Sequence, residues 1–197
     1  MTGEIVRRQR GGARAARPLK IVVTGPFAAG KTSLIQTISE VTVVGTEQPI
    51  TDGTRARKGT TTVAMDFGRV SLPDGLSLFL FGTPGQSRFE VMWEILSEGM
   101  IGFVLLVDAS DPGSATDASA LLEKFRTYAD VPFVVGVTHL EDVADPDSAL
   151  GEVRDRLDLG SEAVVACDPR AREDVKAVLL RILFGVLRRL EPVPATS

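Results

Sequence analysis

The sequence has few of the residues that build disulfide, zinc or histidine chemistry. Cys167 and His139 are the single cysteine and the single histidine among 197 residues, so an intramolecular disulfide, a cysteine-rich zinc site and a catalytic histidine pair are excluded. Long hydrophobic runs are missing too, because basic residues interrupt the most apolar late stretch, residues 175–190. That stretch is also shorter than the roughly 20 residues that cross a bilayer. No apolar segment typical of a secretion signal is visible, and we expect a cytoplasmic protein.

Charge is unevenly distributed along the chain, although the net charge is only -4. Residues 1–20 contain six basic residues and one acidic residue, so the rest of the chain is acidic. An acidic body argues against nucleic acid as a partner. Two interpretations of the basic arm, residues 1–18, stay open. It is either a solvated, disordered tail, or residues 7–20 make a peripheral contact with anionic lipid at the inner face of the membrane or with an acidic partner.

Apolar segments and turn signals alternate between residues 19 and 191. Strands are predicted at 19–24, 62–72, 76–81, 101–108, 131–137 and 163–166, and helices at 33–40, 88–98, 115–128, 147–157 and 172–190. The turn signal at residues 73–75 predicts an antiparallel hairpin. The alternation predicts one α/β domain, residues 19–191, with a mostly parallel six-stranded sheet and helices on both faces. Residues 192–197 are expected to form a flexible tail.

One motif indicates phosphate binding. Residues 25–32 read Gly-Pro-Phe-Ala-Ala-Gly-Lys-Thr and fit the P-loop pattern G-x-x-x-x-G-K-[ST] between a predicted strand and a predicted helix. Glycines let the backbone approach a phosphate closely. The N–H groups that point into the loop and the N-terminus of the following helix then attract its negative charge. We expect Lys31 at the β- and γ-phosphates and Thr32 on Mg²⁺, which prefers oxygen ligands. The predicted phosphate-binding residues are Gly25, Pro26, Phe27, Ala28, Ala29, Gly30, Lys31, Thr32 and Ser33.

Two later segments resemble the switch regions of Ras-like GTPases. Residues 60–68 read Thr-Thr-Thr-Val-Ala-Met-Asp-Phe-Gly, with a threonine four residues before Asp-Phe as in Rab-type proteins. Residues 81–89 resemble the D-T-A-G-Q-E-R-F segment, with Gly82 in place of the aspartate. From about residue 19 to 190 the chain resembles bacterial Ras-like GTPases, including the gliding-motility GTPases and those of actinobacterial conservons. The resemblance implies a Ras-like G domain of the P-loop NTPase class that binds GTP or GDP with Mg²⁺ and hydrolyses GTP.

The resemblance also implies roles at the matched positions. Thr62 corresponds to the switch I threonine that joins Mg²⁺ and senses the γ-phosphate, although the two preceding threonines compete for this role. Gly85 corresponds to the glycine whose N–H meets the γ-phosphate, and Gln86 to the glutamine that orients the attacking water. Gly82 has no side-chain oxygen, so we expect Mg²⁺ to be held more weakly than in ordinary Ras-like proteins.

Two arginines are candidates for stabilising the transition state of hydrolysis. Arg55 and Arg57 lie in the loop that corresponds to switch I. The gliding-motility GTPases resemble this chain in having a switch I arginine that acts in cis. The alternative interpretation is a solvated basic loop.

The expected base-recognition motifs depart from the family pattern. Where N-K-x-D is expected, the chain has Thr138, His139, Leu140, Glu141 and Asp142. Glu141, or Asp142 in a shifted loop, keeps a carboxylate to accept hydrogen bonds from guanine, and His139 is a candidate for lying over the base. Where S-A-K is expected, Pro169 has no N–H to donate to guanine O6, and Asp168 is the alternative contact. The choice between GTP and ATP stays open.

A partner protein is also implied by the resemblance: a roadblock-domain protein, with a sensor-kinase-like protein as a second candidate. On the predicted helix 88–98, Val91 and Ile95 share a face away from the other apolar residues, which makes this face a candidate partner surface. Two other functions stay open. One is a P-loop interaction module that no longer hydrolyses nucleotide, and the other is a small-molecule kinase, which the missing lid-sized insertion disfavours.

Overall fold

The computed structural model describes residues 18–42, 65–85 and 89–191. The strands are β1 (Leu19–Thr24), β2 (Asp66–Ser71), β3 (Ser77–Gly82), β4 (Gly102–Asp108), β5 (Phe133–Thr138) and β6 (Val164–Ala166). The helices are α1 (Lys31–Ile38), α2 (Glu90–Ser97), α3 (Ser114–Tyr128), α4 (Pro146–Leu157) and α5 (Arg172–Leu190). The predicted order of strands and helices is confirmed, with small shifts at the ends; α1, for example, begins at Lys31 rather than at Ser33.

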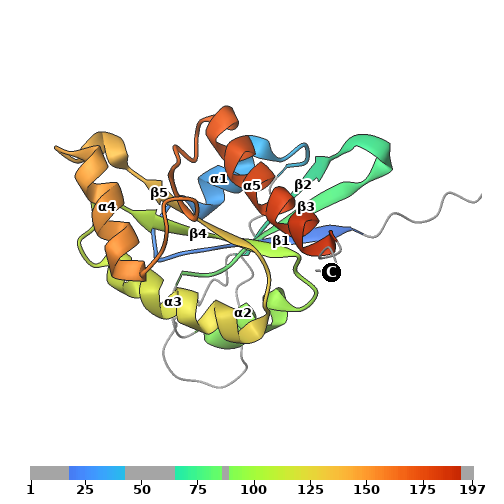
Figure 1. Ribbon diagram of the computed structural model, residues 1–197. Helices are drawn as coiled ribbons and strands as arrows, with labels where there is room; N and C mark the ends of the chain where they lie inside the picture. The colour runs from blue at the N-terminus through green and yellow to red at the C-terminus, as the bar shows by residue number, and fades with distance from the viewer. Residues whose placement is uncertain (1–17, 43–64, 86–88, 192–197) are drawn as a thin grey trace, which may run out of the picture.

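The six strands form one sheet in the order β2-β3-β1-β4-β5-β6. All neighbours run parallel except β2 and β3, which form the predicted antiparallel hairpin at one edge. A short 3₁₀ turn, Pro73–Gly75, joins the two strands, and Asp74 at its centre takes the left-handed conformation with φ 59°. The hairpin projects beyond the body of the domain (Figure 1).

Helices cover both faces of the sheet, as predicted. Helices α1 and α5 lie on one face, and α2, α3 and α4 lie on the other (Figure 1). Burial on both faces explains the apolar run at residues 21–23 of β1. Ile21 and Val23 pack with α1 and α5, whereas Val22 packs with the helices of the opposite face. The same two-sided burial explains the continuous apolar run of β4.

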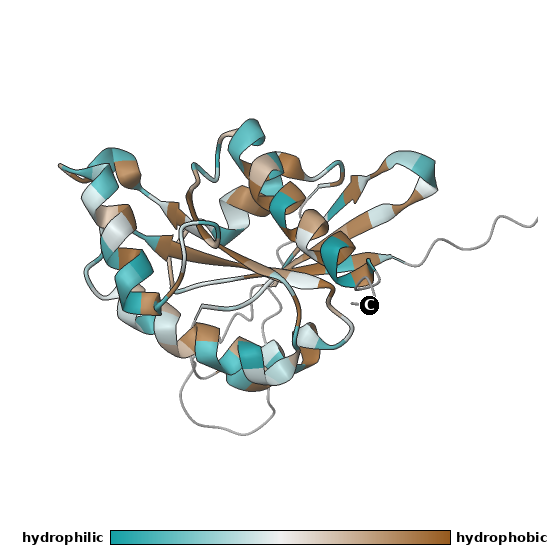
Figure 2. Cartoon of the chain, viewed as in Figure 1, coloured by the Kyte–Doolittle hydropathy of each residue, from teal (hydrophilic) through white to brown (hydrophobic). Residues whose placement is uncertain are grey.

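Hydrophobic residues are concentrated in the central strands and on the inner faces of the helices (Figure 2). On α5, the buried positions recur every three or four residues, as expected for one face of a helix. They are Val175, Val178, Leu179 and Ile182. None of the helices within the described residues combines the length and the apolar composition needed to cross a membrane.

The buried face of α5 gives a prediction about stability. Ile182→Ala should lower the free energy of unfolding by about 2–5 kcal/mol, because it leaves a cavity at a fully buried position. Leu180→Ala, on the same helix but 49% exposed, is the matched control and should cost much less. Urea unfolding of both variants measures the difference, and equal losses would contradict this account of the core.

Candidate functional site

The P-loop connects β1 to α1, and its two glycines have no room for a side chain. A Cβ atom on Gly25, where φ is 149°, would lie 2.5 Å from the carbonyl oxygen of Leu106 in β4. A Cβ atom on Gly30, where φ is 92°, would lie 2.8 Å from the ring of Pro169. Ala28 also takes a left-handed conformation, with φ 63°. The loop is therefore pressed between β4 and the segment after β6, with its backbone turned as phosphate binding requires.

The side chain of Lys31 folds back over this loop. Its Nζ donates hydrogen bonds to the carbonyl oxygens of Gly25, at 2.9 Å, and Pro26, at 2.5 Å. Burial lowers the pKa of Lys31 to about 8, and the charge of Asp66 opposes that shift. The ammonium group of Lys31 thus lies beside the P-loop backbone. Its positive charge is only partly compensated by Asp66, which suits it to bind an anionic phosphate.

Thr32 contacts a carboxylate that the sequence did not lead us to expect. Its Oγ1 donates a hydrogen bond of 2.6 Å to Oδ2 of Asp66, the first residue of β2. Asp66 is buried, with 9% of its surface exposed. A hydroxyl and a carboxylate side by side are oxygen ligands of the kind Mg²⁺ prefers, so the residues present fit the ion that accompanies a nucleotide. The sequence held one signal for this role of Asp66: it is a charged residue on the same face of its strand as Gly68.

Gly85, the predicted γ-phosphate contact, lies against the P-loop. A Cβ atom on Gly85 would be 2.9 Å from the backbone nitrogen of Phe27 and 3.0 Å from Nζ of Lys31. The indole of Trp93 in α2 holds the preceding residue by donating a hydrogen bond of 2.8 Å to the carbonyl oxygen of Pro84. The structure thus places Gly85 against the P-loop, and its contact with a γ-phosphate stays a prediction.

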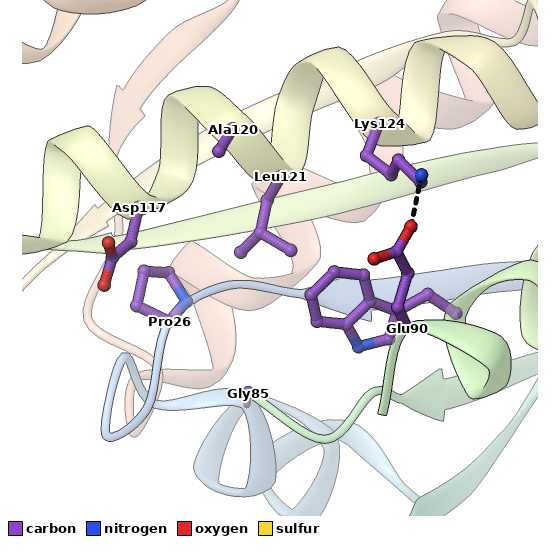
Figure 3. A pocket seen from close by; sticks show the side chains of 8 residues that line it. Pro26, Gly85, Glu90, Asp117, Ala120, Leu121 and Lys124 are labelled. Carbon is purple, nitrogen blue, oxygen red and sulfur yellow. Dashed lines mark ion pairs between the residues drawn. The ribbon is translucent and has the colours of Figure 1, made fainter. Parts of the chain in front are cut away.

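A pocket of about 500 Å³ opens beside this contact, between the P-loop and α3. Pro26 and Gly85 lie on one side of it and Leu121 of α3 on the other (Figure 3). Lys124 of α3 forms an ion pair with Glu90 of α2 at one end of the pocket. The pocket is therefore bounded at this end by a contact between α2 and α3.

Four of the predicted site residues lie outside the residues that the structure describes. These are Arg55 and Arg57, the two candidates for a catalytic arginine, Thr62, the predicted metal ligand, and Gln86, the residue predicted to orient water. Their roles stay predictions.

Strand β5 contacts the P-loop through its last residue, Thr138. This threonine is fully buried, and its hydroxyl lies 3.3 Å from the carbonyl oxygen of Ala29 and 3.2 Å from that of Val107. Next to it, His139 takes a left-handed conformation with φ 56°. The imidazole lies between two carboxylates, with Nδ1 3.4 Å from Asp142 and Nε2 3.9 Å from Asp108. Thr138 thus braces the P-loop, while His139 and Asp142 form the adjacent surface.

Arg170 links the two segments predicted to recognise the base. Its guanidinium pairs with Glu141 and also with Asp168, where Nε lies 2.9 Å from Oδ1. Hydrogen bonding to Arg170 lowers the pKa of Asp168. No motif in the sequence pointed to this arginine.

The backbone between residues 168 and 171 has no unused N–H group. That of Asp168 goes to the carboxylate of Asp174, that of Arg170 to the carboxylate of Asp168, and that of Ala171 to the carbonyl of Asp168. Pro169 has none to offer, and its ring packs on Gly30 instead. The donors that this segment can present to a base edge are therefore those of the Arg170 side chain.

Comparisons with known proteins agree with this picture at the level of nucleotide binding. The family model of the conserved hypothetical ATP binding proteins matches residues 44–180, a range that begins after the P-loop. The uncharacterized protein MJ1339 of Methanocaldococcus jannaschii is 30% identical over 131 residues, which are 66% of this chain and 75% of that protein. Intraflagellar transport protein 22 of Chlamydomonas reinhardtii is 26% identical over 112 residues, 56% of this chain and 55% of that protein. These comparisons support a P-loop nucleotide-binding protein without singling out the bacterial GTPases that the sequence resembles.

The lowered pKa of Lys31 predicts that nucleotide affinity depends on pH. Phosphate binds the protonated amine, and the free protein loses this proton as the pH rises through about 8. Affinity should therefore be steady near pH 7 and fall by about tenfold per pH unit well above 8, with uptake of a proton on binding. Calorimetric titrations between pH 7 and 9.5 measure this profile. Lys31→Ala should bind weakly and lose the dependence, whereas a flat wild-type profile would contradict the prediction.

Proposed function

Because the chain belongs to the family of conserved hypothetical ATP binding proteins, we propose that it is a nucleotide-dependent molecular switch. In this proposal it binds GTP and hydrolyses it slowly to GDP and phosphate, thereby regulating a partner protein. The γ-phosphate orders the segments around Thr62 and Gly85, and hydrolysis releases them.

The observation that best supports this proposal is the contact between Gly85 and the P-loop. A P-loop alone serves many kinds of phosphate enzyme. Gly85 lies so close to the P-loop that a Cβ atom on it would be 3.0 Å from Nζ of Lys31. Because Gly85 starts the link to α2, it adds a segment that can respond to the third phosphate. The indole of Trp93 bonds to Pro84 in this same link, so a movement of Gly85 would be passed to α2. A structural change at the third phosphate can thus be transmitted through Gly85 to α2 at the protein surface.

Guanine as the preferred base is supported by the carboxylates after β5. Glu141 and Asp142 can accept hydrogen bonds from the N1–H and the amine of guanine, whereas adenine presents an acceptor at N1. One observation favours a second candidate function, a nucleotide-binding module with relaxed base selectivity and no hydrolysis. Glu141 is already paired with Arg170, so its oxygens are shared between the arginine and any base.

Titration of GDP, GTP, ADP and ATP with Mg²⁺ into nucleotide-stripped protein separates these functions. The switch predicts guanine-selective binding that Lys31→Ala abolishes, because the ammonium no longer meets the phosphates. Glu141→Gln should then weaken GDP binding more than ADP binding. Equal affinities for guanine and adenine nucleotides would favour the relaxed module, and failure to bind any nucleotide would overturn the proposal.

A catalytic arginine is the next prediction. Replacing Arg55 or Arg57 by Ala should slow single-turnover GTP hydrolysis by about 10³-fold or more, because an arginine neutralises charge that builds up in the transition state. Gln86→Ala should slow the same step by leaving the attacking water unoriented. GTP affinity should stay unchanged in all three variants. Lys58→Ala, in the same basic segment, is the matched control, and an unchanged rate in both arginine variants would rule out an arginine acting in cis.

The proposed partner is a roadblock-domain protein, with a sensor-kinase-like protein acting in the same system. The exposed face of α2 supports a protein partner, since Val91 is 70% and Ile95 53% exposed next to the segment that holds Gly85. We place the switch in the cytoplasm, with residues 7–20 as its contact with the inner face of the membrane.

A further inference from the structure

Helix α5 has a second apolar face, which points away from the core. Leu180, Phe184, Leu187 and Leu190 are 49%, 58%, 54% and 74% exposed. At about 100° per residue these side chains fall within an arc of about 120°, and they extend for about 15 Å along the helix. They therefore form one continuous surface, which we call the α5 stripe. An exposed apolar patch of this kind marks an interaction site.

A groove of about 300 Å³ continues this apolar surface from α5 to the β2–β3 hairpin. Its walls are mainly apolar side chains of both elements, together with two basic residues of α5. The lining includes Val70, Leu72, Leu180, Leu183, Arg172 and Lys176. Because Leu180 belongs to both the groove and the α5 stripe, the two form one surface.

The charge beside the α5 stripe is positive, although the chain outside residues 1–20 is acidic. Residues 181–190 contain three arginines and no acidic residue. Arg188 and Arg181 flank the stripe, about 40° and about 60° around the helix from Phe184. Arg181 donates a hydrogen bond to a backbone carbonyl, and neither of these two arginines is in an ion pair with a residue that the structure describes. Their charges are therefore available to an anionic surface.

The α5 stripe lies toward the edge of the sheet opposite the P-loop. Helix α5 begins near the P-loop, where Pro169 packs on Gly30, and further along Ile182 packs on Gly102, the first residue of β4. The helix thus runs from the carboxyl ends of the parallel strands to their amino ends. Strand β1 also begins at this amino edge, so the segment of residues 1–17, with five arginines and one acidic residue, joins the domain there.

The positive charge decides between two kinds of occupant. A second copy of this chain, packed antiparallel about Phe184, would bring Arg181 of one copy near Arg188 of the other, and the like charges would repel. An anionic bilayer fits both features, because lipid phosphates attract arginines while leucine and phenylalanine side chains enter the boundary between headgroups and acyl chains.

We propose that the α5 stripe, with its flanking arginines, docks the folded domain on an anionic lipid surface. The inference deepens the proposed contact of residues 7–20 with the membrane by adding a surface of the domain itself. In this arrangement α5 lies on the bilayer and does not cross it. The P-loop is at the opposite edge of the sheet and α2 is on its opposite face, so a nucleotide and a protein partner can still bind.

Flotation of the full chain with lipid vesicles tests this docking surface. Phosphatidylcholine vesicles with about 30% phosphatidylglycerol supply the anionic surface, and pure phosphatidylcholine supplies the neutral one. The protein should bind the anionic vesicles, and the affinity should fall as salt is added. Phe184→Ser combined with Leu187→Ser should weaken binding by about tenfold or more, because two inserted side chains are lost. Arg188→Glu should weaken it by about fivefold or more.

Matched controls carry the same changes on the other face of the sheet. Val91→Ser removes an apolar side chain of α2 that is 70% exposed, and Arg126→Glu reverses one charge on α3. Both should bind the vesicles like the wild type. Thermal unfolding verifies that every variant is folded.

Phe184→Trp gives a direct readout of insertion. The natural Trp93 is only 6% exposed, so its emission should not respond to vesicles. The indole introduced on α5 should shift its emission to the blue on anionic vesicles and be quenched by brominated acyl chains. Val91→Trp is the control and should show neither effect.

Each outcome has a distinct meaning. Wild-type affinity in the α5 variants, without a blue shift in Phe184→Trp, would overturn docking through α5 and leave residues 7–20 as the membrane contact. A wild-type protein that ignores anionic vesicles would overturn both contacts, whereas the proposed switch is decided separately by the nucleotide titrations. A dimer in sedimentation experiments that Phe184→Ser with Leu187→Ser dissociates, without vesicle binding, would assign the α5 stripe to a second copy instead.

Discussion

The P-loop backbone is in contact with its surroundings at both glycines, and the rest of the site is arranged around this packing. Gly25 meets the carbonyl of Leu106 in β4, and Gly30 meets the ring of Pro169 after β6. From a third side, the hydroxyl of Thr138 at the end of β5 contacts the carbonyl of Ala29. Strands β4 and β5 and the segment after β6 therefore touch the same loop toward the carboxyl ends of the strands, where ligands bind in open α/β sheets.

This contact explains why departures from the expected base motifs are compatible with a sound phosphate site. Thr138 and Pro169 act on the P-loop through packing and a hydroxyl contact, and neither role needs the residue type that recognises guanine. In the proposed function, base recognition is left to exposed side chains, Glu141 and Arg170, which pair with each other. That proposal assigns phosphate affinity and base selectivity to separate groups, so selectivity can relax while the phosphate site persists.

Sequence reasoning found what depends on neighbours along the chain. The order of strands, the hairpin turn at residues 73–75 and the P-loop are local patterns, and the structure confirms them. Asp66 could not be found in this way, because only the β2–β3 register brings it opposite Gly82. A shift of one residue would turn its side chain to the other face of the sheet. The pairing of Arg170 with Glu141 likewise joins two loops 29 residues apart that share no motif.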